Sequence, residues 1–366
     1  MIIGLAKEIK KEEYRVGLTP TSAKEYIDHG HRVLVESGAG NGTGFADAEY
    51  CNCGCEIVSD RRKLFADAEM IIKVKEPLAE EFDLFHEGQL LYTYLHLAAA
   101  PALTRALLDR KVTGIAYETV SEADGSLPLL APMSQIAGRL AVQEGAKYLE
   151  KPFGGRGILL SGVPGTPRGK VLILGGGVAG SNACRIALGI GADTTVFDVS
   201  ARRLAEIENT FGNSVKTLYS NPGNIDMAIR EADLIIGAVL LPGAAAPRLI
   251  RRDDLAKMKP GAVMVDISID QGGCFETSKP TTHTDPVFNV EGIVHYCVAN
   301  MPGAVSLTST LALTSVTNRY GLQLADLGIE RALTESAPIR AGLNCMAGHL
   351  TNKAVAESHG MSYIMA

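Results

Sequence analysis

The chain has 366 residues, more than one ordinary domain holds, and 46% of them are hydrophobic and 21% charged. This balance is typical of a soluble, globular protein with two domains. A net charge of −6 without a block of basic residues argues against nucleic acid as the main partner. The longest apolar run, residues 234–241, is too short to span a bilayer, and the charged N-terminal segment lacks the apolar core of a signal peptide.

The seven cysteines predict a reducing environment, because an odd number in a long chain without a signal peptide is typical of cytoplasmic thiols. Cys51, Cys53 and Cys55 form a C-x-C-x-C motif, which has the potential to bind a metal. No fourth ligand cluster in the sequence matches this motif. We therefore expect a cytoplasmic protein without a metal site.

The first third of the chain alternates short apolar runs with polar segments of helical pattern, such as residues 22–29, 79–85 and 101–109. Alternating strands and helices are typical of a mostly parallel sheet that is covered on both faces. The expected strands are residues 2–6, 33–36, 56–58, 70–74, 89–95 and 113–117.

A longer helix is predicted over residues 134–149, after Pro132, with Ser134 placed to cap its N-terminus. Small residues along this helix would let it pack closely between two domains. Residues 151–169 are rich in glycine and proline, and they predict a loop that leads into the next strand.

A second series of strands and helices follows this loop. Its expected strands are residues 171–174, 194–198, 215–219, 233–239, 262–267 and 293–298. Six strands with helices between them match a complete doubly wound domain. A further helix is expected over residues 308–321, and we expect the last helical segments to return to the first domain. The sequence thus predicts an α/β protein with two doubly wound, Rossmann-like domains and a cleft between them.

The turn that follows residues 171–174 carries the strongest local signal. Gly175, Gly177 and Gly180 fit the pattern G-x-G-x-x-G at the point where a strand becomes a helix. These glycines allow a tight turn, close approach of a pyrophosphate, and close packing of the helix on the strand. The helix N-terminus supplies N–H groups and a positive dipole for the phosphates. Asp198 ends the next strand, where its carboxylate can bind an adenosine ribose and repel a 2′-phosphate, so the motif predicts NAD rather than NADP.

Four polar residues lie at predicted strand ends or in the first loop. Arg15 can bind a substrate carboxylate with two parallel hydrogen bonds, and Lys75 follows a buried strand. His96 can exchange a proton near neutral pH, and Asp270 is expected to end an apolar strand. Because ligands bind at the carboxyl ends of strands in open α/β sheets, we expect Lys75 and His96 on one lip of the cleft and Asp270 on the other. Taken singly, each of these residues is explained equally well as a surface charge, a structural histidine or a turn former. Taken together, they favour catalysis.

At these residues the chain resembles the alanine dehydrogenases, and the resemblance extends over essentially its full length. It is carried by Glu-Tyr-Arg-Val near the start and by six longer motifs. The longer motifs are Lys-Val-Lys-Glu-Pro (73–77), Tyr-Leu-His-Leu-Ala (94–98), Leu-Pro-Leu-Leu-Ala-Pro-Met-Ser (127–134), Leu-Gly-Gly-Gly-Val-Ala-Gly (174–180), Asp-Gln-Gly-Gly-Cys-Phe-Glu-Thr (270–277) and Val-Ala-Asn-Met-Pro-Gly-Ala-Val (298–305).

The resemblance implies NAD-dependent oxidative deamination of L-alanine to pyruvate and ammonium, the reverse amination, and a homohexamer. We expect a substrate domain of residues 1–128 and 307–366, and an NAD domain of residues 129–306. The resemblance assigns Arg15 and Lys75 to the substrate, with Arg15 on the carboxylate, and His96 and Asp270 to catalysis. It assigns the cofactor site to Ser134, Gly175, Gly177, Val178, Ala179, Gly180, Asp198, Arg203, Ser220, Val239, Leu240, Ile267, Ser268, Ile269, Asp270, Lys279, Val298, Ala299, Asn300 and Met301.

Three places depart from the family pattern. Lys279 stands where arginine is expected, Gln135 where glutamate is common, and Ser306-Leu307 where proline and a basic residue are usual. The last two lie beside the expected cofactor site or cleft, so they bear on affinity and domain closure more than on the type of reaction.

Three other functions stay open at the level of sequence. The chain also fits the NAD-binding subunit of a proton-translocating transhydrogenase, a related dehydrogenase that forms lysine or saccharopine, or an NAD-sensing protein without catalysis. The set of His96, Asp270 and Lys75, together with the lack of an apolar run long enough to cross a membrane, distinguishes the chain from the transhydrogenase subunit.

Overall fold

The computed structural model describes residues 1–239 and 246–365, and the chain divides into two compact units. Unit 1 comprises Met1–Met133 and Gly303–Ala366, and unit 2 comprises Ser134–Pro302. The limits expected from the sequence, at 128/129 and 306/307, lie a few residues away. Among the described residues, no helix combines the length and the apolar character needed to cross a membrane.

A central sheet organises unit 1, with eight strands among the described residues in the order β15-β14-β6-β5-β4-β1-β2-β3. The strands from β6 to β3 are parallel, and β14 and β15 extend one edge with antiparallel pairs. Strands buried on both faces need near-continuous apolar sequences, as β4 and β5 have. The strands are β1 (Ile2–Leu5), β2 (Arg32–Glu36), β3 (Glu56–Val58), β4 (Met70–Ile72), β5 (Leu90–Thr93), β6 (Thr113–Ala116), β14 (Leu343–Met346) and β15 (His349–Leu350).

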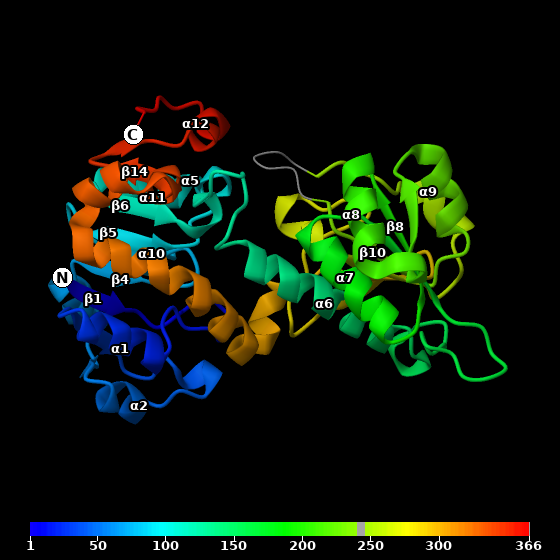
Figure 1. The fold of residues 1–366 in the computed structure, drawn as a ribbon, viewed down its shortest axis with the longest axis horizontal. Helices are drawn as coiled ribbons and strands as arrows, with labels where there is room; N and C mark the ends of the chain where they lie inside the picture. The colour runs from blue at the N-terminus through cyan, green and yellow to red at the C-terminus, as the bar shows by residue number, and fades with distance from the viewer. Residues whose placement is uncertain (240–245, 366) are drawn as a thin grey trace. The chain divides into compact units, whose positions relative to one another are not determined.

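Helices cover both faces of this sheet (Figure 1). Leu64 of α3 and Leu103 of α5 pack into one core cluster with Leu91 of β5. The next residue of that strand, Tyr92, donates its hydroxyl to the Thr317 carbonyl of α10 at 3.0 Å, because successive side chains of a strand point to opposite faces. The helices are α1 (Pro20–Asp28), α2 (Asp47–Asn52), α3 (Arg61–Asp67), α4 (Ala79–Phe82), α5 (Pro101–Asp109), α10 (Ser306–Glu335), α11 (Ala337–Gly342) and α12 (Lys353–His359).

The described part of unit 2 has seven strands in the order β12-β13-β11-β10-β7-β8-β9. All pairs are parallel except β12 with β13 at one edge. From β9 to β13 this is the 3-2-1-4-5-6 order of a doubly wound domain, and the sheet of unit 1 has the same order from β3 to β6. The strands are β7 (Lys170–Leu174), β8 (Asp193–Asp198), β9 (Lys216–Tyr219), β10 (Leu234–Gly237), β11 (Val263–Asp266), β12 (Val287–Val290) and β13 (Ile293–Tyr296).

The helices of unit 2 approach its sheet closely where the sequence supplies glycine. A Cβ atom on Gly138 would lie 2.0 Å from the Ala179 carbonyl oxygen, and one on Gly145 would lie 2.5 Å from the Leu234 side chain. Close packing of the predicted long helix therefore occurs against α7 and β10. The helices are α6 (Ala131–Tyr148), which begins at the end of unit 1, α7 (Val178–Gly189), α8 (Ala201–Phe211) and α9 (Pro222–Ile229).

Every strand expected from the sequence is present, within two residues of its expected limits, so the fold class of two Rossmann-like parallel sheets is confirmed. Three local expectations are wrong. Ser134 does not cap α6, because the helix begins at Ala131, where Pro132 occupies a first-turn position that needs no backbone donor. Asp270 does not end a strand, because it lies in the 3-10 helix η7 (Ile267–Gln271) after β11. The helix expected over residues 308–321 runs on to Glu335 through a kink at Gly328.

Candidate functional site

Each sheet reverses its strand order at one point, between β1 and β4 in unit 1 and between β7 and β10 in unit 2. In open α/β sheets ligands bind outside the carboxyl ends of the strands at such a point. Arg15 follows β1 and Lys75 follows β4, whereas Gly175 follows β7. The predicted residues therefore fall where the topology of each sheet favours a ligand site.

Arg15 is buried, with 2% of its surface exposed. The carboxylate of Glu13, also buried, accepts hydrogen bonds from Arg15 Nε at 2.7 Å and from Nη2 at 2.5 Å. Arg15 Nη1 lies 3.0 Å from Met133 Sδ. Burial opposes the charge of Arg15, yet the hydrogen bonds and the charge of Glu13 raise its pKa above the usual value. Arg15 is thus a fixed, charged group rather than a solvated surface charge.

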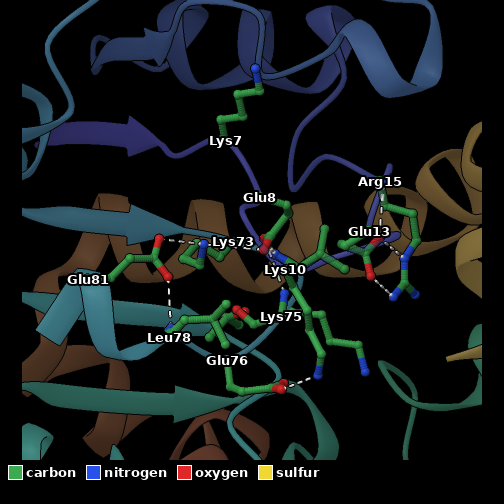
Figure 2. Close-up of polar contacts among 12 residues, drawn as sticks. Lys7, Glu8, Lys10, Glu13, Arg15, Lys73, Lys75, Glu76, Leu78 and Glu81 are labelled. Atoms are coloured by element: carbon green, nitrogen blue, oxygen red, sulfur yellow. Dashed lines mark hydrogen bonds and ion pairs between the residues drawn. The ribbon is translucent and has the colours of Figure 1, made fainter. Parts of the chain in front are cut away.

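A buried ionic cluster lies at the end of β4 (Figure 2). Lys73 Nζ contacts Glu81 Oε1 at 2.9 Å and Glu8 Oε2 at 3.2 Å, and the three side chains are at most 3% exposed. Burial raises the pKa of Glu8, although the charge of Lys73 opposes this. Burial would lower the pKa of Lys73, but the charges of Glu8 and Glu81 raise it. Removing one member of such a cluster leaves a buried charge uncompensated, at a cost of about 3–5 kcal/mol.

The same cluster fixes the backbone that carries Lys75. Glu8 Oε1 accepts the N–H of Val74 at 2.6 Å and of Lys75 at 3.2 Å. The Thr93 hydroxyl donates to the Lys75 carbonyl at 3.1 Å. Lys75 is 9% exposed and lies three residues beyond the end of β4 at Ile72. It is therefore held in a shaped loop and not on the strand itself.

His96 lies beyond β5 in a left-handed backbone conformation, with φ 49° and ψ 35°, which is uncommon for a residue other than glycine. Glu118 holds this conformation by accepting the His96 N–H at 2.6 Å. The imidazole stacks on Tyr94, with ring centroids 5.8 Å apart. Its Nδ1 atom lies 3.3 Å from Oε2 of Glu76, and the ring is 40% exposed.

The structure brings Arg15, Lys75 and His96 into one neighbourhood of unit 1. Tyr94 connects two of them, because its ring stacks on His96 and the charge of Arg15 acts on its hydroxyl. Glu76 connects Lys75 with His96, because it follows Lys75 in the chain and its carboxylate contacts the His96 ring. A guanidinium, an ammonium and an imidazole around one site suit a small substrate with a carboxylate and a reactive oxygen or nitrogen.

The glycine turn of unit 2 has the geometry that the motif predicts. Gly175 has φ 101°, and a Cβ atom there would lie 2.6 Å from the Ala238 carbonyl oxygen. A Cβ atom on Gly180 would lie 1.8 Å from the Gly175 carbonyl oxygen. Gly177 is the N-cap of α7, and a Cβ atom there would meet nothing within 4 Å. The first and third glycines are required by the fold, and the open space at the second leaves the helix N-terminus accessible to an anion.

Asp198 binds the glycine turn directly. Its Oδ2 atom accepts the N–H of Gly176 at 2.7 Å, and its Oδ1 atom accepts the N–H of Ser200 at 2.8 Å. A carboxylate has about four acceptor positions, so these two bonds leave capacity for the hydroxyls of a ribose. Asp198 therefore shapes the turn and also keeps a negative charge beside it.

Asp266 organises the segment that contains Asp270. It is fully buried and accepts the N–H of Ser268 at 3.0 Å, the N–H of Cys274 at 2.9 Å and the hydroxyl of Ser278 at 2.5 Å. Burial raises the pKa of Asp266, against the effect of these bonds. These hydrogen bonds hold the segment from Ser268 to Ser278 as a closed loop, and Asp270 is an exposed residue of this loop.

The other predicted cofactor residues of unit 2 lie mostly at the carboxyl ends of its strands. The N–H of Ser220 donates to the Asp198 carbonyl at 3.0 Å, and the Ser268 hydroxyl donates to the Val239 carbonyl at 2.7 Å. Asn300 has a left-handed backbone, with φ 64°, in the segment after β13. Ile269, Val298 and Met301 are buried, Ser134, Ala179, Ile267 and Ala299 are partly buried, and Val178 is exposed. Leu240 lies outside the described residues.

Arg203 and the positions that depart from the family pattern have specific contacts. Arg203 pairs with Glu206 on α8 at 2.7 Å, and both line a pocket of 460 Å³ together with Gln135. Lys279 Nζ lies 4.4 Å from the centre of the Phe288 ring. Separately, at the start of α10 in unit 1, the Ser306 hydroxyl donates to the Gly42 carbonyl at 2.8 Å.

Sequence reasoning missed the acidic residues that hold the predicted ones. Glu13 and Glu76 lie beside Arg15 and Lys75 in the chain, so their spacing is a signal that could have been used. Asp266 ends a buried strand, as Asp198 does. Glu118 has no such signal, because only the fold brings it to His96.

Two doubly wound sheets, a glycine turn and an acidic residue at the end of the following strand define a Rossmann-type nucleotide-binding protein. The chain matches the family models "Alanine dehydrogenase/PNT, N-terminal domain" over residues 4–137 and "Alanine dehydrogenase/PNT, C-terminal domain" over residues 141–353. It is 56% identical to an alanine dehydrogenase of Bacillus subtilis (strain 168), across 100% of this chain and 97% of that protein. The chain belongs to the alanine dehydrogenase family.

Solved structures agree with this assignment. The structure of an L-alanine dehydrogenase is similar with a TM-score of 0.95 and 50% identity, over 98% of this chain and 99% of that one. A transhydrogenase from Sinorhizobium meliloti is similar with a TM-score of 0.81 and 24% identity, over 97% of this chain and 100% of that one. At this lower identity the likeness shows the fold alone.

Proposed function

We propose that the chain is an NAD-dependent L-alanine dehydrogenase, which converts L-alanine, NAD and water to pyruvate, ammonium, NADH and a proton, and catalyses the reverse amination. Family membership supports the reaction. The observation that carries the proposal is the gathering of Arg15, Lys75 and His96 at the ligand-binding edge of the sheet in unit 1.

The cofactor fits unit 2. The open space at Gly177 and the N-terminus of α7 suit a pyrophosphate, and Asp198 suits the hydroxyls of the adenosine ribose. A 2′-phosphate would meet the charge of Asp198, so NAD is preferred over NADP. The remaining residues assigned to this site by family resemblance are proposed to complete it, Leu240 included.

Unit 1 is proposed to hold the substrate. Arg15 is proposed to bind the substrate carboxylate, and Glu13 fixes the guanidinium through its Nε–Nη2 edge. The ammonium of Lys75 is placed to polarise the substrate oxygen and to stabilise negative charge on it. Glu13 fixes the Arg15 guanidinium and Glu8 fixes the backbone of Lys75, so little ordering of these groups is needed when the substrate binds.

Proton transfers are proposed for His96 and Asp270. NAD, when bound, supplies the chemistry of hydride acceptance from the substrate Cα. His96 then takes and returns protons on the substrate nitrogen and oxygen as the imine is hydrolysed. Asp270 orients or deprotonates the attacking water.

The assembly and location are also proposals. Family resemblance supports a homohexamer, and light scattering after size-exclusion chromatography would test it. A cytoplasmic location is supported by the seven cysteines, none of which forms a disulfide. Small molecules are the expected partners, without nucleic acid or membrane.

A screen of amino acids with NAD and NADP tests the proposed function. We expect NADH formation with L-alanine, and weak activity with serine and 2-aminobutyrate, because one methylene changes discrimination by only ~1–3 kcal/mol. Faster turnover of leucine or glutamate would reject the substrate, comparable turnover with NADP would reject the cofactor, and no turnover would favour a sensing or docking role.

A further inference from the structure

Glu76 has a buried carboxylate oxygen that faces the imidazole of His96. Glu76 Oε2 lies 3.3 Å from His96 Nδ1. Among the described residues this oxygen has no hydrogen bond of regular geometry, so the imidazole is the donor that it faces. Oε1 of the same carboxylate accepts from Lys10 Nζ (Figure 2). The carboxylate is therefore anchored at one oxygen and directed at the ring with the other.

This contact decides which ring nitrogen carries the proton. A carboxylate can only accept a hydrogen bond, so a neutral ring that donates to Glu76 carries its proton on Nδ1. The lone pair then lies on Nε2, which is the atom left to act as a base. A hydrogen bond donated by Nδ1 thus leaves Nε2 as the nitrogen that can accept a proton.

The remaining contacts of His96 hold its position but not its tautomer. Glu118 accepts the backbone N–H of His96 and fixes the left-handed turn. Tyr94 stacks on one face of the ring. Neither group contacts Nδ1 or Nε2, so among these neighbours Glu76 is the one that can choose between the two tautomers.

Electrostatics keep Glu76 in the form that this role requires. Burial opposes its charge, yet the hydrogen bond from His96 and the charges of Lys75 and Lys10 hold the pKa of this carboxyl well below its usual range. Glu76 is therefore an acceptor over the whole neutral range. The charged groups beside the ring and its carboxylate are Glu76, Lys75 and Lys10 from the loops, Glu118 at the His96 backbone, and Arg15 through Tyr94.

We propose that Glu76 is a positioning residue of the reaction, which holds His96 in the tautomer and orientation that present Nε2 to the substrate. The inference rests on the proposed function, because it assigns Glu76 a role through His96. It adds to that function a residue that determines whether His96 can act as the base.

The test is Glu76→Gln in the full-length enzyme. The amide can donate to Nδ1 and so favours the wrong tautomer, and we expect kcat for alanine oxidation to fall about tenfold to hundredfold, part of the ~10²–10⁴-fold that a general base contributes. KM for alanine and NADH binding should change less than about threefold. The pH–rate profile should also change, because the amide removes a negative charge beside the ring. Glu76→Asp should restore most of kcat and the original profile.

Two comparisons separate this role from a structural one. Glu80→Gln removes the same charge from an exposed position on α4, and it should leave kcat and the profile unchanged. Adding Glu76→Gln to His96→Ala should cause little further loss, because both changes act through one ring. If wild type oxidises alanine and His96→Ala is impaired, but Glu76→Gln keeps the wild-type kcat and profile, the role of Glu76 is rejected and the function stands. If wild type does not oxidise alanine, the proposed function itself fails.

Discussion

At the scale of residues, Arg15 gives the first prediction. Arg15→Lys removes the planar fork that grips a carboxylate, so KM for alanine and for pyruvate should rise about tenfold to hundredfold, as expected for loss of ~1.5–3 kcal/mol. NADH binding, measured by fluorescence, should stay within about twofold. Arg62→Lys, at an exposed position of α3, is the matched control and should change neither. Unchanged substrate saturation in Arg15→Lys would remove Arg15 from the substrate site.

Asp198 gives the second prediction, because one carboxylate serves both the glycine turn and the proposed ribose site. Asp198→Asn should weaken NAD binding by ~1–3 kcal/mol, which is roughly tenfold to a hundredfold in Kd, and weaken NADP binding less. Asp193→Asn removes the same charge at the opposite end of β8 and should leave both affinities unchanged. Equal losses for NAD and NADP would show that Asp198 acts only on the turn.

Residues of the candidate site could be predicted from the sequence only where a local motif identifies them. Gly175, Gly180 and Asp198 lie within one motif, and the structure gives each the contacts that the motif requires. The dependence of His96 on Glu118 could not be predicted, because the two residues are distant in the sequence and only folding brings them together.

At the scale of elements, the turn from β7 to α7 provides a paired test. Gly180→Ala places a methyl group 1.8 Å from the Gly175 carbonyl oxygen if nothing moves, so α7 must shift away from its strand. We expect a lower midpoint of thermal unfolding and a loss of NADH binding of at least about tenfold, since the phosphates depend on this helix N-terminus. A Gly180→Ala variant that binds NADH normally would contradict this account of the turn.

Gly189→Ala is the matched control at the other end of α7. A Cβ atom there meets nothing within 4 Å, and the backbone is not left-handed. Alanine is the better helix former by ~1 kcal/mol, so this variant should unfold at the same or a slightly higher temperature and keep NADH affinity.

Element types could be predicted because buried parallel strands are short apolar runs between polar helices. Element ends could not, since they depend on tertiary contacts. Of residues 73 and 74, which follow β4, only Val74 is apolar. The buried ion pair of Lys73 with Glu8 holds the backbone in a loop there, and Glu8 also accepts the N–H of Val74. The same cluster explains why Lys75 lies beyond the strand rather than at its end.

At the scale of the whole molecule, we expect unit 1 to lose stability at alkaline pH because of the tyrosines in its core. Six of its tyrosines have pKa values raised by burial: Tyr26, Tyr50, Tyr92, Tyr94, Tyr117 and Tyr320. A group whose pKa is higher in the folded state keeps a proton that the unfolded chain loses above pH ~10. Its contribution to stability is fully present below that pH and is lost as the pH rises toward the folded pKa, at ~1.4 kcal/mol per pH unit for each group.

We therefore expect unit 1 to unfold cooperatively within about one pH unit above pH ~10, where six such groups act together. Tyrosinate absorbance should rise in step with the loss of helical circular dichroism. Tyr26→Phe removes a hydroxyl that has no hydrogen-bond partner among the described residues, so it should shift the midpoint to higher pH. Tyr14→Phe, at a residue that is 50% exposed, should leave the midpoint unchanged. Gradual ionisation of all tyrosines with intact circular dichroism, or equal shifts in the two variants, would mean that the buried phenols do not control the stability of this unit.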